Sequence, residues 1–265
     1  MDRDAAIGIF DSGVGGLTVL HAILESLPDE HLVYLGDTGR TPYGNKSAEI
    51  ITRDALESAD FLVERRLKLL VVACNAATAT ALEALRAHVA VPVIGVVEPG
   101  VRAALRATRT GRVGVIGTEA TIASGAYTRA LRAHNPAVEV FTRACPLFVP
   151  LAEEGWTEGA VARTVAETYL ASLARSGIDT LILGCTHYPL LKPLIAEVMG
   201  PAVTLVDSAE ETAREVAARL AADGTARPAG PGSTSFFVTD APDRFVRIGQ
   251  RFLGARVESA VRIER

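Results

Sequence analysis

Short apolar runs alternate with longer segments in which apolar residues recur every three or four positions. The short runs are typical of buried parallel strands and the longer segments of amphipathic helices. This pattern predicts strands at 7–10, 31–35, 69–73, 91–95, 112–117, 138–141, 181–184, 203–206 and 236–238. It predicts helices at 17–27, 47–66, 76–88, 121–134, 158–176 and 208–223, with others ending near Arg106 and Met199 and one last helix. Strands that alternate with helices indicate an α/β fold with doubly wound, mostly parallel sheets.

Breaks in this pattern predict where the chain turns or crosses. Glu98-Pro-Gly100 and Val206-Asp-Ser208 are expected crossings and candidate hinges, and residues 145–150 read as a bent apolar segment. Residues 224–235 are rich in Gly, Pro, Ser and Thr, which predicts an exposed linker. Ser47 is expected to cap the helix that follows it.

A weak internal repeat divides the chain. Residues 7–12 and 113–118 each combine a strand, a turn and the start of a helix. In each half a strand that ends in a cysteine follows, with Cys74 lying 63 residues after Asp11 and Cys185 lying 68 residues after Gly117. Two similar domains related by a pseudo-twofold axis would bring these two strand ends face to face.

Composition narrows the function classes. The chain has 265 residues, 22% of them charged, and a formal net charge of −4, so no basic footprint indicates nucleic-acid binding. No run of about 18 apolar residues predicts a membrane span, and the first residues do not resemble a signal peptide. Three cysteines without a CxxC pair predict neither a disulfide framework nor a structural zinc site. We therefore expect a cytoplasmic protein with no membrane or nucleic-acid partner.

Two phosphate-binding patterns fail on inspection. Gly13, Gly15 and Gly16 follow a strand, but Thr18 stands where a dinucleotide fingerprint needs its third glycine. Residues 39–46 have the outline of a phosphate loop, but no strand leads directly into it. Asp11 and Ser12 are better read as polar groups lining a cleft, although a helix-capping role fits them equally well.

The cysteines carry the candidate chemistry. Cys145 lies in an apolar segment and reads as inert packing. Cys74 and Cys185 instead stand at strand ends, each followed at once by polar residues and a predicted helix start. A helix N-terminus favours a thiolate by lowering a thiol pKa from about 8.5.

Several chemistries fit a reactive thiol in this setting. Cys185 with His187 two residues away suggests a nucleophilic hydrolase. Zinc binding by these two residues and Cys74 lacks the usual ligand spacing, and a redox disulfide would need the Cα atoms within about 7 Å. Two opposed thiols suggest another reaction, in which one thiolate removes a proton from a carbon and the other thiol returns one to the opposite face.

The ordered motifs resemble those of the glutamate racemases, cofactor-independent enzymes that supply D-glutamate for peptidoglycan. The resemblance covers nearly the whole chain, and aspartate and hydantoin racemases share the paired cysteines without the complete set. It rests on residues 8–17, 36–38, 42–44, 73–75, 117–118 with Thr121, 145–148, 153–155 and 184–191.

The resemblance implies two α/β domains with the active site in the cleft between them, and we place them at residues 1–97 with 208–265 and at 98–207. It assigns Cys74 to the D-face and Cys185 to the L-face of the glutamate α-carbon. Asp11 and His187 would set the protonation of the thiols, with Glu153 or Glu154 as a further carboxylate, of which we choose Glu154 as catalytic. The implied substrate-binding residues are Asp11, Ser12, Pro42, Tyr43, Gly44, Asn75, Ala76, Thr121, Thr186 and His187.

Ala76 departs from the commonest family pattern, which has Thr or Ser there. A missing hydroxyl costs a hydrogen bond of about 0.5–1.5 kcal/mol, so a related racemase acting on another substrate also fits the residues. Two functions of a different class fit as well, a protein that binds glutamate without turning it over and one that regulates a partner such as a topoisomerase. The resemblance implies no cofactor or metal, L- or D-glutamate as the small-molecule substrate, and a homodimer.

Overall fold

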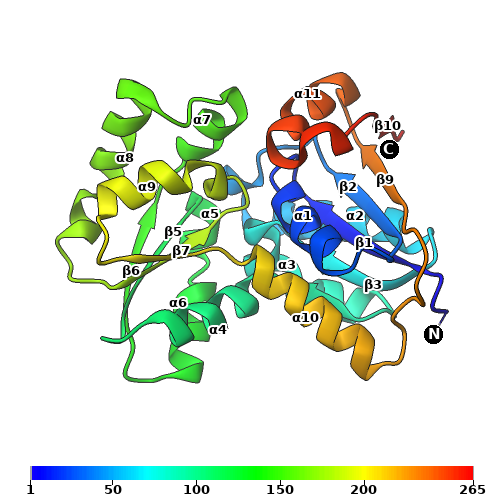
Figure 1. The fold of residues 1–265 in the computed structure, drawn as a ribbon, viewed down its shortest axis with the longest axis horizontal. Helices are drawn as coiled ribbons and strands as arrows, with labels where there is room; N and C mark the ends of the chain where they lie inside the picture. Colours follow the sequence, from blue (N-terminus) through cyan, green and yellow to red (C-terminus); the bar gives the residue numbers. More distant parts are fainter. Residues whose placement is uncertain (1, 265) are drawn as a thin grey trace.

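The structure is a computed structural model that describes residues 2–264. Within these residues the chain forms two parallel sheets. Figure 1 shows the sheets in two lobes side by side, with both ends of the chain on the same lobe. The first sheet contains β1 (Ala6–Asp11), β2 (Leu32–Gly36), β3 (Leu67–Val72), β4 (Val93–Gly95), β9 (Thr234–Val238) and β10 (Val261–Arg262). The second contains β5 (Arg112–Gly117), β6 (Glu139–Ala144), β7 (Thr180–Gly184) and β8 (Thr204–Val206).

The two sheets repeat one topology. The first has the order β10-β9-β2-β1-β3-β4 and the second β6-β5-β7-β8, and every recorded strand pair in the described residues is parallel. Within each lobe the first strand therefore lies between the second and third, with the fourth outside the third. This confirms the predicted α/β fold of two similar parallel-sheet domains. Their proposed boundaries stay a prediction.

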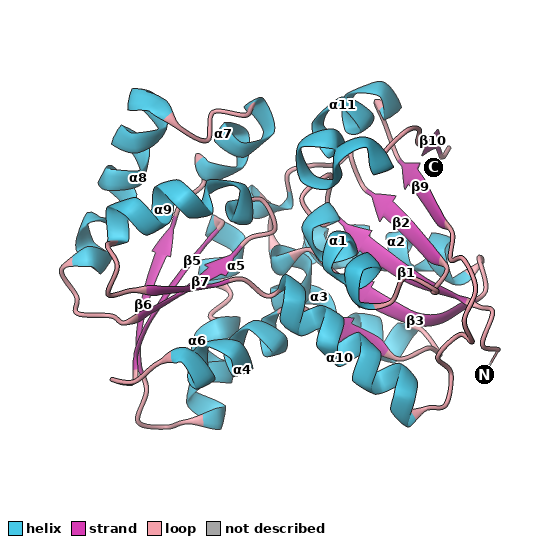
Figure 2. Ribbon diagram, viewed as in Figure 1, coloured by secondary structure: helices cyan, strands magenta, loops and turns pink. Residues whose placement is uncertain are grey.

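Helices cover both faces of each sheet (Figure 2). They are α1 (Leu17–Ser26), α2 (Ala48–Val63), α3 (Asn75–His88), α4 (Val97–Ala107), α5 (Glu119–Ala123), α6 (Ala126–His134), α7 (Phe148–Glu154), α8 (Gly159–Ala174), α9 (Lys192–Met199), α10 (Ala209–Ala222) and α11 (Pro242–Leu253). The described residues also form three short 3₁₀ helices, η1 (Tyr43–Asn45), η2 (Tyr188–Leu191) and η3 (Gly254–Arg256).

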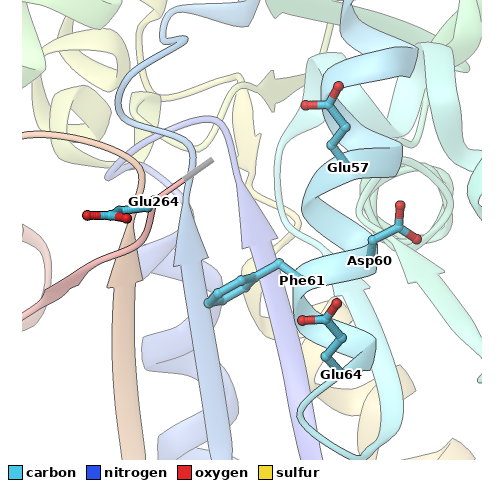
Figure 3. A pocket seen from close by; sticks show the side chains of 5 residues that line it. All are labelled: Glu57, Asp60, Phe61, Glu64 and Glu264. Atoms are coloured by element: carbon cyan, nitrogen blue, oxygen red, sulfur yellow. The ribbon is translucent and has the colours of Figure 1, made fainter.

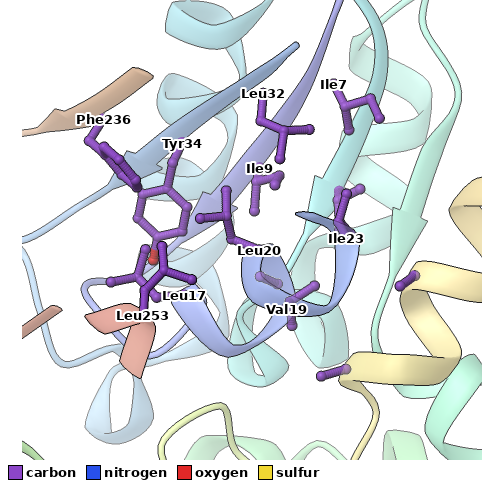
Figure 4. Packing of buried hydrophobic residues seen from close by; sticks show 14 of the residues in the cluster. Ile7, Ile9, Leu17, Val19, Leu20, Ile23, Leu32, Tyr34, Phe236 and Leu253 are labelled. Carbon is purple, nitrogen blue, oxygen red and sulfur yellow. The ribbon is translucent and has the colours of Figure 1, made fainter. Parts of the chain in front are cut away.

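Alternation along the strands supplies two cores in each lobe. On β1, Ile7 and Ile9 face α1, α10 and α11, whereas Phe10 faces α2 and α3. Figure 4 shows the first of these cores, where Tyr34 and Phe236 from neighbouring strands meet the apolar side of α1. In the second lobe, Val115 packs toward α4 and α6, and Ile116 toward α7 and α8. Burial on both sheet faces explains the apolar runs in the sequence.

The predicted breaks were only partly right. Glu98-Pro-Gly100 is not a break between elements, because α4 begins at Val97 and includes it. The chain does cross between the lobes beside it, since β4 belongs to the first sheet and α4 packs on the second. The hinge role stays a prediction. The expected helix at 121–134 is divided into α5 and α6 by Gly125, which has φ of +66°. The bent segment at 145–150 leads into α7, and the sequence pattern missed both this helix and β10.

The predicted linker at 224–235 is exposed at seven of its twelve positions, as expected, but it is held against the first lobe. Thr225 is buried, and its carbonyl accepts a hydrogen bond from Lys68 at 3.0 Å. A Cβ atom at Gly232 would lie 2.2 Å from the carbonyl oxygen of Glu30, so the chain packs closely there. The segment therefore docks on the first lobe and runs directly into β9.

Candidate active site

Cys74 and Cys185 occupy equivalent positions, just beyond the carboxyl ends of β3 and β7. Both are buried, with 5% and 7% of their surfaces exposed, and both line one cavity between the lobes. The free space between the lining atoms is about 350 Å³. The cavity is lined by Ser12, Thr41, Pro42, Tyr43, Gly44, Cys74, Asn75, Ala76, Thr118, Thr121, Val149, Cys185, Thr186 and His187.

Cys74 begins α3, as the sequence indicated. Its Sγ accepts a hydrogen bond from the backbone N–H of Ala77 at 3.5 Å and lies 3.6 Å from Oγ of Ser12, to which it donates. Burial, and secondly the negative charge of Asp11, raise the pKa of Cys74 to about 12. Cys74 is therefore a thiol at neutral pH, ready to donate a proton.

Asp11 lies fully buried beneath the cavity at the end of β1. Its Oδ2 accepts the backbone N–H of Gly13 at 2.9 Å, whereas Oδ1 has no hydrogen-bond partner among residues 2–264. Burial raises the pKa of Asp11, and the nearby positive charge of His187 partly offsets that rise. A proton on Asp11 is thus easier to keep than on an ordinary carboxyl group, which suits exchange with a neighbouring thiol.

The glycines after Asp11 bring the two lobes into contact. A Cβ atom at Gly15 would lie 2.3 Å from Oγ1 of Thr186 and 2.5 Å from Nδ1 of His187. A Cβ atom at Gly16 would lie 2.5 Å from Cβ of Asp11. Glycine is required because the backbone approaches these side chains closely, and no nucleotide is needed to explain the motif.

His187 lies beside the thiol of Cys185. Its Nδ1 lies 3.8 Å from Sγ of Cys185, and its Nε2 lies 3.2 Å from Oε1 of Glu153. Burial lowers the pKa of His187, but the hydrogen bonds to Cys185 and Glu153 outweigh it and raise the pKa to about 10. The buried ring is an imidazolium at neutral pH and can stabilise a thiolate on Cys185.

The loop before α2 closes the cavity from the first lobe. The hydroxyl of Tyr43 donates to Oδ2 of buried Asp37 at 2.5 Å, which fixes the ring at the cavity wall. The backbone at Gly44 presses on the second lobe, since a Cβ atom there would lie 2.6 Å from Cβ of Thr118. Thr118 caps α5, and its Oγ1 lies 3.0 Å from Oγ1 of Thr121.

Known proteins share both the sequence and this geometry. The model of the Asp/Glu/hydantoin racemase family matches residues 7–216. The chain belongs to this family. Glutamate racemase of Geobacter metallireducens is 60% identical over 253 residues, covering 95% of this chain and 94% of that protein.

Solved racemases have the same fold. Glutamate racemase isoform RacE1 of Bacillus anthracis superposes with a TM-score of 0.96 at 41% identity, covering 99% of this chain and 98% of that one. The Francisella tularensis glutamate racemase, solved in complex with D-glutamate, gives 0.94 at 35% identity with the same coverage. As a member of this family the chain is a racemase, an isomerase of the cofactor-independent type.

In this racemase the carboxylate beside His187 is Glu153, whereas the sequence favoured Glu154. Glu154, the predicted catalytic residue, is exposed, whereas Glu153 contacts His187. Glu153 also pairs with Arg244 of α11, whose Nη2 lies 3.0 Å from Oε2. Hydrogen bonds to His187 and the charge of Arg244 outweigh burial and lower the pKa of Glu153. The structure therefore places Glu153, and not Glu154, beside His187.

The remaining predicted site residues gather as expected around the cavity, with Asp11 just beneath it. Sequence reasoning missed Thr41, Thr118, Val149, Tyr127 and Arg244. Thr118 belongs to the recognised motif at 117–118 and Thr41 precedes the one at 42–44, so their place in the sequence was a usable signal. Arg244 lies more than 50 residues from any recognised motif, and no local pattern marks it.

A wider hollow on the racemase surface has different chemistry. It has free space of about 820 Å³ and is lined by Glu57, Asp60, Phe61, Glu64 and Glu264. Figure 3 shows these side chains along α2 and near the end of the chain. Four carboxylates and no thiol or imidazole line it, so we place the reaction at the cysteines.

Two further observations concern metal binding and membrane insertion. Among residues 2–264, no three His, Cys, Asp or Glu side chains are grouped to hold a metal ion, and Cys74, Cys145 and Cys185 are free. No helix in that range is both long and apolar enough to cross a membrane.

Proposed function

We propose that this racemase interconverts L- and D-glutamate by proton transfer between Cys74 and Cys185. The observation that carries the proposal is the placement of both buried thiols at equivalent strand ends around one cavity. The names of the relatives support glutamate as the substrate, and the Francisella tularensis enzyme was solved with D-glutamate.

The two thiols have different neighbours. The raised pKa of Cys74 keeps its proton in place, whereas the positively charged ring of His187 lies 3.8 Å from Sγ of Cys185. With Cys185 on the L-face, its thiolate takes the α-proton of L-glutamate while Cys74 gives its proton to the D-face. The electron pair of the broken C–H bond stays on the substrate until the new C–H bond forms. D-glutamate leaves, and the reverse reaction begins with a Cys74 thiolate and a Cys185 thiol.

The starting states must be restored between turnovers. Asp11, whose pKa is raised by burial, can give a proton to the Cys74 thiolate and regain one from solvent. His187 is already an imidazolium and cannot accept the proton that Cys185 has gained, so that proton passes to solvent, while the positive charge of His187, held by Glu153 at 3.2 Å, stays beside the sulfur. No cofactor is needed to return both sulfurs to their starting states.

Hydrogen-bond donors must stabilise the negative charge that develops on the substrate carboxylate. The N-terminus of α3 lies at the cavity. Its free backbone N–H groups and the positive end of its dipole both favour an anion there. The hydroxyls of Ser12 and Thr186 and the amide of Asn75 line the same space. Enclosure strengthens these interactions because little water competes with them.

Single substitutions of the cysteines test the mechanism. Cys74→Ser and Cys185→Ser should each abolish racemisation, measured by circular dichroism from either enantiomer. Cys145→Ala is the matched control, since this third buried cysteine does not line the cavity and should stay active. Near wild-type rates in both single mutants would refute the two-thiol assignment.

The cavity also justifies a test of substrate choice. Ala76 presents a methyl group to the cavity where a hydroxyl is common in the family, so a different acidic or small amino acid is the second candidate. Racemisation of D-aspartate and further amino acids under the same conditions would reveal it. A protein that only binds glutamate would show no solvent-deuterium incorporation at the α-carbon.

We further propose that the product serves peptidoglycan synthesis in the cytoplasm, and that the enzyme is a homodimer. Family membership supports the first idea. Depletion of the enzyme in its host should produce a requirement for added D-glutamate. Sedimentation at several concentrations measures the oligomeric state, and a monomer throughout would refute the dimer.

A further inference from the structure

Tyr127 of α6 reaches across the floor of the cleft to the opposite lobe. The side chain is 2% exposed, and its hydroxyl lies 2.6 Å from Oδ1 of Asn75 on α3. Asn75 follows Cys74 directly and lines the cavity. A residue of the second lobe thus holds a cavity residue of the first.

The ring of Tyr127 also touches the backbone that carries Cys185. A Cβ atom at Gly184 would lie 3.1 Å from Cε2 of Tyr127, and Gly184 is the residue before Cys185. A Cβ atom at Gly100 would lie 3.7 Å from both Cε1 and the hydroxyl oxygen. Glycine at 184 leaves room for the ring, whereas a Cβ atom at 100 would make an ordinary van der Waals contact with it. One buried phenol therefore contacts the neighbours of both reactive cysteines.

The hydrogen bond from Tyr127 determines how the Asn75 amide is oriented. Oδ1 is only an acceptor, so the Tyr127 hydroxyl must donate to it. This single hydrogen bond joins the two lobes and leaves the N–H₂ side of the Asn75 amide to face other groups.

This arrangement leaves one strong donor unused. Nδ2 of Asn75 is buried and has no hydrogen-bond partner among the described residues, although buried polar groups are normally paired. Asn75 is 3% exposed and lines the cavity of the two thiols. An unpaired buried N–H₂ group at this position indicates that its partner is an anionic group of the ligand.

We propose that Tyr127 is a positioning residue that locks the Asn75 amide with its N–H₂ group directed at a substrate carboxylate. The inference rests on the proposed glutamate racemisation. Without the phenol hydroxyl, Oδ1 of Asn75 loses its buried partner and the amide is free to turn. A turned amide presents an oxygen to the carboxylate and repels it.

Tyr127→Phe tests this role while keeping the ring that packs on Gly184. We expect kcat/KM for glutamate to fall about tenfold or more, mainly through a higher KM, because a hydrogen bond to a charged group is lost. Tyr169→Phe is the matched control, since the hydroxyl of that tyrosine of α8 accepts the backbone N–H of Leu147 and the residue does not line the cavity.

A double-mutant cycle separates positioning from general destabilisation. If Tyr127 acts through Asn75, Tyr127→Phe should change kcat/KM less than about twofold in an Asn75→Ala background. A purely structural effect would appear equally in both backgrounds and in the melting temperature. An equal loss in both backgrounds, or no loss in the single mutant, overturns the inference.

The failure of the proposed function is distinguishable from the failure of this inference. If the unmodified enzyme racemises glutamate but Tyr127→Phe behaves as Tyr169→Phe does, only the inference fails. If the unmodified enzyme binds glutamate without racemising it, the racemase proposal fails, and the same cycle read as Kd by calorimetry still decides the role of Tyr127. If glutamate neither binds nor reacts, both proposals are refuted.

Discussion

Gly44 provides a sharp test of how closely the lobes must approach for catalysis. It lies in η1 of the first lobe, against Thr118 at the start of α5 in the second. An added methyl group would lie 2.6 Å from Cβ and 2.7 Å from Cγ2 of Thr118. Non-bonded carbons prefer about 3.5–4.0 Å, so Gly44→Ala requires the two surfaces to separate by about 1 Å.

The separation should reduce catalysis more than stability. The clashing atoms belong to different lobes, so opening the cleft relieves the contact without disturbing either core. A misplacement of about 1 Å can cost about 100-fold in rate, and we expect a loss of that order in kcat/KM. The free energy of unfolding should change by less than about 1 kcal/mol, because no core packing is lost.

Circular dichroism at several concentrations of each glutamate enantiomer measures the loss, and urea unfolding measures stability. Gly39→Ala is the matched control in the same loop, because the nearest atoms to its new methyl group would be Oγ1 of Thr239 at 3.2 Å and Cβ of Asp240 at 3.3 Å, both in its own lobe. The reasoning is refuted if Gly44→Ala keeps kcat/KM within about threefold of the unmodified enzyme, which is far less than the estimate from misplacement. An equal loss in Gly39→Ala would refute it as well.

Two further predictions concern pH and stability. His187 has a folded pKa of about 10, so its positive charge is present at neutral pH and is lost as pH rises. We expect kcat/KM of the unmodified enzyme to decline near pH 10. The His187→Asn variant should be slow at all pH values and should not show that decline. If the variant keeps the same pH profile as the unmodified enzyme, the reasoning is contradicted. Lys68→Met should lower the free energy of unfolding by about 3–5 kcal/mol, because it leaves the buried carboxylate of Glu30 without its cation, although Oε1 still accepts the backbone N–H of Arg227. Adding Glu30→Gln to Lys68→Met should restore most of the lost free energy of unfolding, measured by urea unfolding. A loss below about 1 kcal/mol in the single mutant would contradict the reasoning.

The sheets and the two cysteine positions could be predicted because they depend on local pattern. Apolar runs on β3 and β7 are buried on both faces, and each ends where polar residues begin. The errors at Pro99 and Pro150 share one cause. Each is the third residue of a helix, α4 or α7, where the backbone N–H would have no partner within the helix. Proline is tolerated there, so it marked a helix start and not an interruption.

The choice between Glu153 and Glu154 could not be made from sequence. Successive helical residues point about 100° apart, so one of the two must face away from the cleft. Which one depends on how α7 docks against His187 and α11, and that docking joins segments far apart in the chain. The same holds for Tyr127, whose importance depends on a contact with Asn75, 52 residues away.

The position of β9 beside β2 has a consequence for synthesis on the ribosome. β2 ends at Gly36, but β9, which pairs with its outer edge, begins only at Thr234. The helix α10, which packs against α1, is also made late. At about 5–20 residues per second, the edge of β2 and the apolar side of α1 stay uncovered for roughly 10–40 s. The second lobe is made in one continuous stretch and can fold during that interval. Nascent chains stalled before residue 209 should therefore attract chaperones through the first lobe.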